Sequence, residues 1–335
     1  MNIKNILKHR HMKYILFGLC VALVPQLAQM GLMRNATVIV LGYVIFYAVA
    51  AIGLNILLGY SGLISLGTAA FMGLGAYLSG YFTGTLGLPF LLSLVLSVSI
   101  PVIIGAVVGL VSLRVSGMYL AIATLAAAEV FRQIFVEFTD LTGGFSGMRA
   151  AFPEFFGWEL NRNQTFIFLV IILVVLMILT DNFVRSKTGR ALLTMRVSET
   201  AASAMGISLI KYKLIAFSLA TAYAAIAGVM YMHFINFAFP TEWTLLLSLQ
   251  ILAAVVIGGL KTVFGPVIGS FIVFGVPSLF LNRLPIIGDI PGLAFIFTGI
   301  LIIVVILFYP NGLIYIGNDL KRIISKAKRR GEVNE

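Results

Sequence analysis

Charged side chains are scarce in this sequence. Asp, Glu, Lys and Arg make up 10% of the 335 residues, against about 25% in an ordinary soluble domain, whereas 60% are hydrophobic and the mean hydropathy is +1.07. A soluble fold needs far more polar surface than this composition supplies. The composition therefore excludes a soluble enzyme, a nucleic-acid-binding domain and a disordered chain. It favours an all-α, polytopic integral membrane protein.

Residues that form disulfides or bind metals are nearly absent as well. Cys20 is the single cysteine, which excludes an intrachain disulfide and a cysteine-based zinc site. His9 and His11 belong to a basic N-terminal tail, and His233 is isolated in the sequence. We therefore expect no metal site, no catalytic residues and no cofactor bound by this chain.

Long apolar runs dominate what remains. No charged residue occurs between Arg34 and Arg114, a run long enough for three crossings of about 20 residues each, with turns near residues 60–62 and 84–89. We predict about ten transmembrane helices, some of them broken, in the following apolar blocks: 14–33, three within 35–113, 117–138, 164–180, 214–237, 244–260, 265–281 and 290–308.

The distribution of basic residues predicts the orientation. With ten crossings and both termini inside, all 23 Lys and Arg residues lie on the inner side except Arg34, Arg132, Arg149, Arg162 and Arg283. The positive-inside rule favours this arrangement. It predicts a cytoplasmic tail (1–13), a membrane domain (14–309) with an external loop (139–163) and a cytoplasmic loop (184–213), and a second cytoplasmic tail (310–335).

Two charges interrupt an otherwise apolar crossing. Glu129 and Arg132 are three residues apart, so they can pair on one helix face. Charges at this depth are costly and usually face a bundle interior or a water-filled path. Two interpretations stay open: contact with the charged groups of a transported molecule, or a structural ion pair.

The cytoplasmic loop carries a short pattern of its own. We expect Gly189 to break the chain, a short amphipathic helix over Thr194–Met205 with Ser198 as a cap, and Gly206 to end it. The run from Glu199 to Gly206 resembles the "EAA…G" loop of bacterial ABC importer permeases. That resemblance implies docking onto an ATPase subunit by these residues: Gly189, Arg190, Arg196, Glu199, Ala201, Ala202 and Gly206. The alternative is an ordinary basic loop at the membrane surface.

Two glycine-rich segments, Gly59–Gly67 and Gly258–Gly269, form a weak internal repeat. Each joins two apolar blocks on the predicted inner side. Repeats are common in transporters, although closely spaced glycines also simply let membrane helices pack closely. The residues that we expect near a translocation path are Ser61, Gly62, Ser65, Gly67, Tyr119, Thr124, Glu129, Arg132, Gly258, Gly259, Thr262 and Gly265.

Seven sequence blocks in order, from Ile52 to Leu313, carry a wider resemblance. They include GLNILLGYSGLISLGTAAFMGLGAY, LRVSGMYLAIATLAAAEVFRQI, TGGFSGM, GRALLTMRVSETAASAMGI and YPNGL. The chain resembles the LivH/LivM family of branched-chain amino acid permeases, and in particular its LivM-type subunit. Permeases for urea and short-chain amides share the pattern. An ion-coupled secondary transporter is a further alternative, but it would not need the docking loop.

The resemblance implies a function and partners. It implies an importer subunit in the bacterial inner membrane that works by alternating access, beside a second homologous permease subunit (LivH-type), two ATPase subunits (LivG/LivF-type) that bind ATP and Mg²⁺, and an extracytoplasmic substrate-binding protein. No phosphate-binding loop occurs in this sequence, so ATP hydrolysis falls to those partners. The family's external turn corresponds to Thr142, Gly143, Gly144 and Gly147.

One position departs from the family pattern. Lys261 stands where the family usually has a glycine that can adopt a positive φ. Either the second glycine-rich turn has a different shape, or the Lys261 side chain extends to the inner membrane surface.

Overall fold

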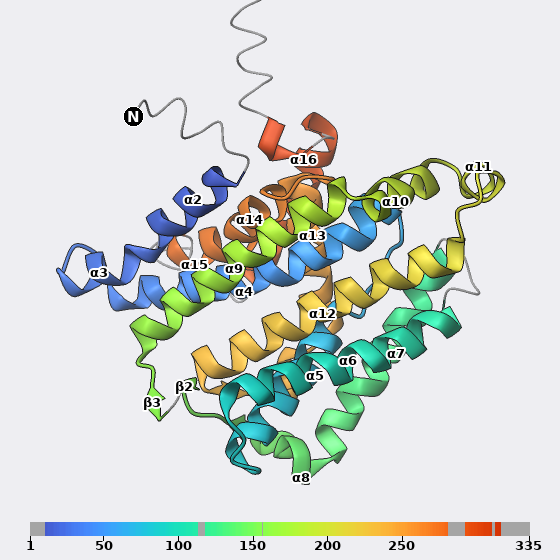
Figure 1. The fold of residues 1–335 in the computed structure, drawn as a ribbon. Helices are drawn as coiled ribbons and strands as arrows, with labels where there is room; N and C mark the ends of the chain where they lie inside the picture. Colours follow the sequence, from blue (N-terminus) through green and yellow to red (C-terminus); the bar gives the residue numbers. More distant parts are fainter. Residues whose placement is uncertain (1–10, 113–117, 156, 281–291, 310–311, 316–335) are drawn as a thin grey trace, which may run out of the picture.

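The computed structural model describes residues 11–112, 118–155, 157–280, 292–309 and 312–315. The two expected basic tails lie largely outside these residues, as do positions 113–117 and 310–311 of the family motifs. The described part of the chain is a bundle of helices with two small antiparallel sheets (Figure 1).

Helices dominate the chain up to the external loop, and short elements make up the loop. In order, these elements are α2 (Met12–Ala22), α3 (Val24–Gln29), α4 (Asn35–Asn55), the π-helix η1 (Ile56–Tyr60), α5 (Thr68–Gly84), α6 (Phe90–Ser112), α7 (Met118–Glu137), α8 (Thr139–Thr142), η2 (Gly144–Ser146), β1 (Met148–Arg149), β2 (Glu154–Phe155) and β3 (Trp158–Glu159).

The described residues after the external loop form helices and one strand. These elements are α9 (Arg162–Arg185), α10 (Lys187–Val197), α11 (Glu199–Ala204), α12 (Leu209–Ile235), β4 (Phe237–Ala238), η3 (Pro240–Glu242), α13 (Leu245–Gly258), α14 (Gly265–Ser270), the π-helix η4 (Phe271–Gly275), α15 (Val276–Leu279), α16 (Leu293–Phe308) and η6 (Leu313–Tyr315).

Each predicted apolar block coincides with a helical segment. Six helices in the described residues are long and apolar enough to cross a membrane, and shorter apolar helices occupy 245–258, 265–279 and 295–305. The polytopic all-α fold is therefore confirmed. The count of ten crossings and the orientation stay predictions.

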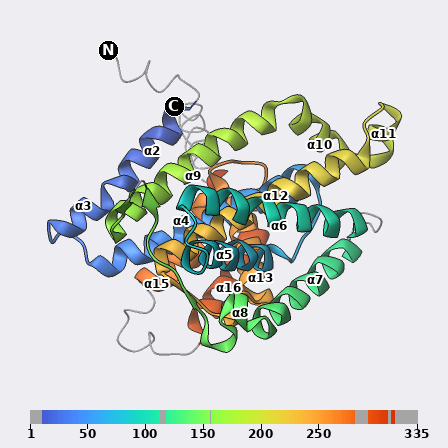
Figure 2. The ribbon, with the colours of Figure 1, turned by 60° about the horizontal axis from the view of Figure 1, so that its bottom comes forward.

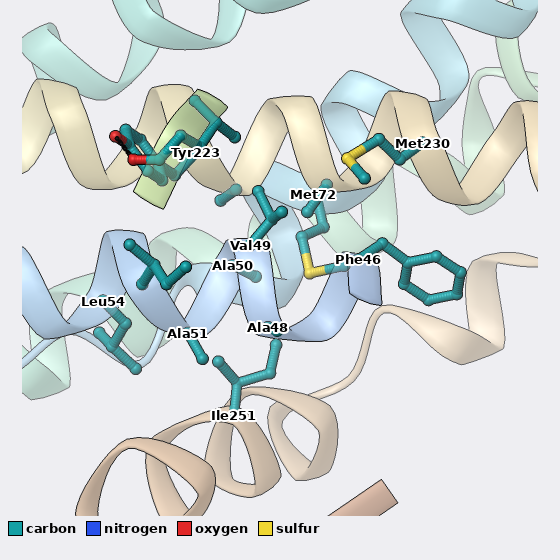
Figure 3. Close-up of a cluster of buried hydrophobic side chains, with 14 of the residues drawn as sticks. Phe46, Ala48, Val49, Ala50, Ala51, Leu54, Met72, Tyr223, Met230 and Ile251 are labelled. Atoms are coloured by element: carbon teal, nitrogen blue, oxygen red, sulfur yellow. Dashed lines mark hydrogen bonds between the residues drawn. The ribbon is translucent and has the colours of Figure 1, made fainter. Parts of the chain in front are cut away.

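Helix α4 forms the centre of the bundle. It packs against α12, α13 and α14, and its residues from Ala48 to Ile52 are fully buried. Figure 3 shows Tyr223 and Met230 of α12 on one side of α4 and Ile251 of α13 on the other. An apolar helix needs apolar neighbours on all sides when protein rather than lipid surrounds it.

Glycines set the close contact between α5 and α12. A Cβ on Gly228 would overlap the carbonyl oxygen of Met72, and one on Gly75 would overlap that of Ala225. Backbone atoms cannot move aside as a side chain can. Close helix approach through small residues is the usual way that membrane helices gain packing energy.

The two predicted hydrophilic loops lie at opposite ends of the bundle. Helix α9 joins them directly, with the β2–β3 hairpin before its first residue and α10 and α11 after its last (Figure 1). Strand β1 pairs with β4 at the hairpin end, which ties the predicted external loop to the end of α12. The structure therefore agrees with opposite locations for these loops.

The orientation has a direct test. In a background that replaces the exposed Cys20 with serine, we expect an impermeant thiol reagent added outside to label a cysteine at Phe155 and to spare one at Thr200. The basic asymmetry is the reason. Labelling of whole cells and of inverted vesicles measures it, and the reverse pattern would show that the topology is inverted.

Candidate functional site

Two glycine-rich turns meet at the α10–α11 end of the bundle. The first (residues 59–67) follows η1, and the second (residues 258–265) joins α13 to α14. Asn55, the last residue of α4, packs against Gly59 of the first turn and hydrogen-bonds the second: its Nδ2 donates to Thr262 O at 2.7 Å, and its Oδ1 accepts from Lys261 N at 3.2 Å. The Asn55 side chain is fully buried, and the two bonds satisfy both its donor and its acceptor. Sequence reasoning identified both turns but missed Asn55.

Glycine is needed in the second turn for close packing. A Cβ on Gly258 would overlap Gly265 O, and a Cβ on Gly269 would overlap Ala254 O. These contacts let α13 and α14 cross at backbone distance. They support the interpretation that the glycines serve helix packing.

Lys261 keeps the backbone shape of the glycine that it replaces. Its φ is +62°, in the left-handed region that costs a non-glycine residue about 1 kcal/mol. The side chain is exposed and lines a pocket at this end of the bundle. Lys261 therefore adopts the left-handed conformation open to a glycine, and its side chain is exposed.

The first turn is fastened to α7 through a hydroxyl. Thr124 Oγ1 accepts from Leu66 N and donates to Ala121 O, both at 3.0 Å, and Ser65 Oγ accepts from Gly67 N at 3.3 Å. Ser61 Oγ donates to Leu57 O. The predicted path residues of this turn are thus brought together, but their hydroxyls bind backbone groups.

A small cavity lies beside this turn. Ser65, Thr68 and Thr221 line it, and its volume is about 10 Å³. An amino acid cannot enter a space of this size, so the buried side of the first turn is closed in this conformation.

The predicted cytoplasmic loop differs from expectation in two details. Thr194–Met205 is not one helix: the chain is extended at Ser198, which separates α10 from α11 and caps α11 by accepting from Ala201 N at 3.2 Å. Gly189 does not break the chain but lies within α10, where a Cβ would overlap Val184 O. The break is at Ser186, whose extended backbone ends α9. Gly206, with φ +78°, follows α11 as predicted.

Two side chains connect this loop to the bundle. Arg196 Nη1 donates to Gly59 O in the first glycine-rich turn. Glu199 Oε1 lies 2.6 Å from Nζ of Lys213, a buried lysine in the first turns of α12. Glu199 is therefore engaged within the chain, although its pattern had suggested a contact with a partner.

The tip of the loop exposes two large apolar side chains among polar and small ones. Val197 is 87% exposed and Met205 is 74% exposed, whereas Ala202 is buried against the bundle. Ala201 and Gly206 are exposed beside them. Sequence analysis did not predict Val197 and Met205 as part of the docking surface. Their exposure depends on where α10 ends and α11 begins.

Comparison with known proteins now gives the family. The sequence model for the permease component of branched-chain amino acid transport systems matches residues 36–306. The chain belongs to this family. No solved structure matches it significantly.

Curated relatives carry the same description. The chain is 29% identical over 293 residues to the high-affinity branched-chain amino acid transport system permease protein LivM of Salmonella typhimurium, covering 80% of this chain and 67% of the relative. It is 28% identical over 308 residues to the protein of that name from Escherichia coli, covering 84% and 71%. A probable LivM of Methanocaldococcus jannaschii is 24% identical over 316 residues, covering 80% and 90%. The permease is accordingly a multi-pass protein of the bacterial cytoplasmic membrane.

The predicted pair on α7 of the permease forms, but on an unexpected face. Arg132 Nε donates to Glu129 Oε1 at 2.8 Å. The Glu129 side chain is 58% exposed and that of Arg132 30% exposed, so neither faces the interior of this chain. Tyr119 is also exposed on α7, which lies at the edge of the bundle (Figure 2). The apolar surroundings in sequence could not reveal which face the pair occupies.

The predicted external turn is a compact, self-bonded structure. Thr142 is buried, and its Oγ1 donates to Phe135 O at 2.6 Å and accepts from Gly144 N at 3.1 Å. Gly143, Gly144 and Gly147 all have positive φ. A side chain at Gly143 would overlap Gly147 O, which explains the glycine there.

Sequence analysis did not identify two polar residues at the end of the bundle that holds the predicted external turn. His233 is not isolated in the fold: its Nε2 lies 2.8 Å from Ser79 Oγ and its Nδ1 lies 2.8 Å from Ala151 O. Glu242, after α12, accepts from the hydroxyl of Tyr231. Burial raises the pKa of the Glu242 carboxyl, and the hydrogen bond from Tyr231 acts in the opposite direction.

The Asn55 contact can be tested by mutation. Asn55→Leu removes the partner of Lys261 N–H and Thr262 C=O, which are partly buried, and should lower the free energy of unfolding by roughly 0.5–1.5 kcal/mol. Ser270→Ala is the matched control, because the Ser270 hydroxyl is buried without a hydrogen-bond partner among the described residues. Unfolding of the purified permease by denaturing detergent measures both, and equal stability of the two variants would contradict the assigned role.

Proposed function

We propose that the permease and a second homologous permease subunit form the membrane path of an ABC importer for branched-chain amino acids. Separate ATPase subunits bind ATP and Mg²⁺ and supply the energy, and an extracytoplasmic binding protein delivers the substrate. The names of the relatives favour branched-chain amino acids over urea or short-chain amides. The observation that carries the proposal is the contact of the α10–α11 segment with the glycine-rich turns through Arg196.

The α10–α11 tip has the properties of a docking element. Exposed Val197 and Met205 give it apolar surface, and exposed Ala201 and Gly206 allow a partner's backbone to approach closely. Exposed large apolar side chains at a projecting tip mark interaction sites. We assign this surface to the ATPase subunit.

Three contacts carry a movement of the tip into the membrane domain. Glu199 and Lys213 tie α11 to α12, the helix that packs on α4, α5 and α6. Arg196 ties α10 to the first glycine-rich turn, and Asn55, at the end of α4 just before that turn, hydrogen-bonds the second. A displacement of the tip by the ATPase therefore reaches both turns and the central helix pair. This is the two-state linkage that alternating access requires.

The pair on α7 extends the proposal to the subunit interface. Glu129 and Arg132 would face hydrocarbon if this chain stood alone. A single charged side chain at the centre of a membrane helix costs roughly 2.5–3.5 kcal/mol. A second permease subunit against this face removes that cost. We therefore place Glu129, Arg132 and Tyr119 at the interface between the two permeases, on the side that lines the translocation path.

A charge exchange tests the coupling contacts. Glu199→Lys puts two cations together and should reduce ATP-driven leucine uptake about tenfold, since a charged hydrogen bond contributes roughly 1.5–3 kcal/mol. The double variant Glu199→Lys, Lys213→Glu restores the pair and should recover most uptake.

Gly206→Asp, at the exposed tip, should leave the protein inserted but uncouple hydrolysis from transport. Proteoliposomes with the partner subunits allow uptake and phosphate release to be measured together.

The outcomes separate the candidate functions. Normal transport by Glu199→Lys and Gly206→Asp would show that this segment does not couple hydrolysis to transport. Uptake driven by an ion gradient without co-purifying ATPase subunits would instead indicate a secondary transporter.

A double-mutant cycle tests the α7 pair. If the pair is structural, Glu129→Gln and Arg132→Gln should each reduce the amount of assembled complex, and the double variant should restore it because no unpaired charge remains. We expect this rescue, with partial leucine uptake. Assembly is measured by co-purification of the second permease. Full uptake by the assembled double variant would refute a role in substrate contact.

A further inference from the structure

A basic pocket opens at the α10–α11 end of the permease. Its volume is about 660 Å³, and it lies between the start of α2, the α9–α10 junction and the second glycine-rich turn. Lys13, Arg185, Arg190 and Lys261 line it, and Asp181 is the carboxylate among its described lining residues. The lining is therefore strongly cationic.

Among the residues that the structure describes, the contacts of the four cations involve a single carboxylate, that of Asp181. Asp181 Oδ1 accepts from Arg185 Nε at 3.1 Å, and its Oδ2 lies 4.0 Å from His11 Nδ1. Arg190 Nη1 donates to a backbone carbonyl, that of Arg185, at 2.9 Å. Lys13 Nζ lies 5.0 Å from the centre of the Tyr14 ring. One carboxylate against four cations favours an anionic ligand.

An apolar groove adjoins the pocket. Its volume is about 520 Å³, and it runs between α2–α3, α4 and α14–η4. The lining includes Phe17, Val24, Leu41 and Ile268, and Cys20 lies beside them. Leu16 and Leu19 of α2, and Leu23 directly after it, are exposed apolar side chains on the same segment.

One aromatic residue links the two spaces. Phe264 lines both the basic pocket and the apolar groove. Its ring stacks on Tyr14 at 5.0 Å and meets Phe17 edge-on at 5.5 Å. The cationic part and the apolar part therefore follow one another along the same side of α2.

We propose that this composite site binds an anionic phospholipid, with the phosphate of the headgroup in the basic pocket and an acyl chain in the groove. A free phosphate would use only the pocket, and a neutral lipid would use only the groove. Basic pockets between membrane helices on the cytoplasmic side bind anionic headgroups, which agrees with the predicted orientation. The bound lipid would join α2 to the second glycine-rich turn and to the start of α10.

Native mass spectrometry of the full-length permease in detergent tests the headgroup contact. Phosphatidylglycerol and phosphatidylcholine with identical acyl chains are titrated into wild type and into Lys13→Gln, Lys261→Asn. Asparagine is used at 261 because it tolerates the positive φ. Lys211→Gln, which removes an exposed lysine outside the pocket, is the control.

We expect wild type and the control to retain phosphatidylglycerol in preference to phosphatidylcholine. The double variant should bind phosphatidylglycerol roughly 30-fold more weakly, from about fivefold per lysine. Equal retention of both lipids by wild type, or an unchanged affinity in the double variant, would overturn the proposal. Displacement of the lipid by millimolar inorganic phosphate would show a free-anion site instead.

The single cysteine gives an independent readout of the groove. A small fluorophore on Cys20, at the groove wall, should be quenched more strongly by phosphatidylglycerol with a nitroxide on its acyl chain than by the matching phosphatidylcholine. The difference should vanish in Lys13→Gln, Lys261→Asn. Equal quenching by the two lipids in wild type would refute the groove assignment. Neither measurement involves ATP or transport, so failure here is distinguishable from failure of the proposed function.

Discussion

A single buried amide holds together the part of the permease on which its proposed action depends. Asn55 lies on the central helix α4 and hydrogen-bonds the backbone of the second glycine-rich turn on both its donor and acceptor sides. The first turn starts four residues later, and Arg196 from α10 binds its first carbonyl, that of Gly59. The Asn55 amide itself is fully buried, where a hydrogen bond is stronger than in water. The core helix, both turns and the docking segment therefore form one connected unit.

Much of the fold follows from the scarcity of charged residues in the sequence. Each apolar block of membrane length coincides with a helical segment, because only helices satisfy the backbone in lipid, whereas the short helices α8 and α10 lie outside the predicted blocks. Side-chain direction was less accessible. All faces of an apolar helix look alike in sequence, so the outward position of Glu129 and Arg132 on α7 could not be predicted.

In the candidate site, too, some features could be predicted from the sequence and others could not. The glycine turns and the segment around Glu199 were found because glycine spacing and the acidic–alanine pattern are local signals. Ser198 was predicted as a cap and caps α11, but the predicted helix began at Thr194, because residues 194–197 have no local signal that separates the end of α10 from the start of α11. Asn55 was missed because its partners lie more than 200 residues away, at Lys261 and Thr262.

The central claim is that the docking segment and the two turns move as one unit. Hydrogen–deuterium exchange in the reconstituted complex, with and without ATP, measures this directly. The account predicts that residues 59–67 and 258–265 change protection together on ATP addition. In Arg196→Gln, which removes the bond to Gly59 O, the change should stay within α10–α11. Unchanged protection of both turns in the wild-type complex during active transport, or an identical response in the variant, would contradict it.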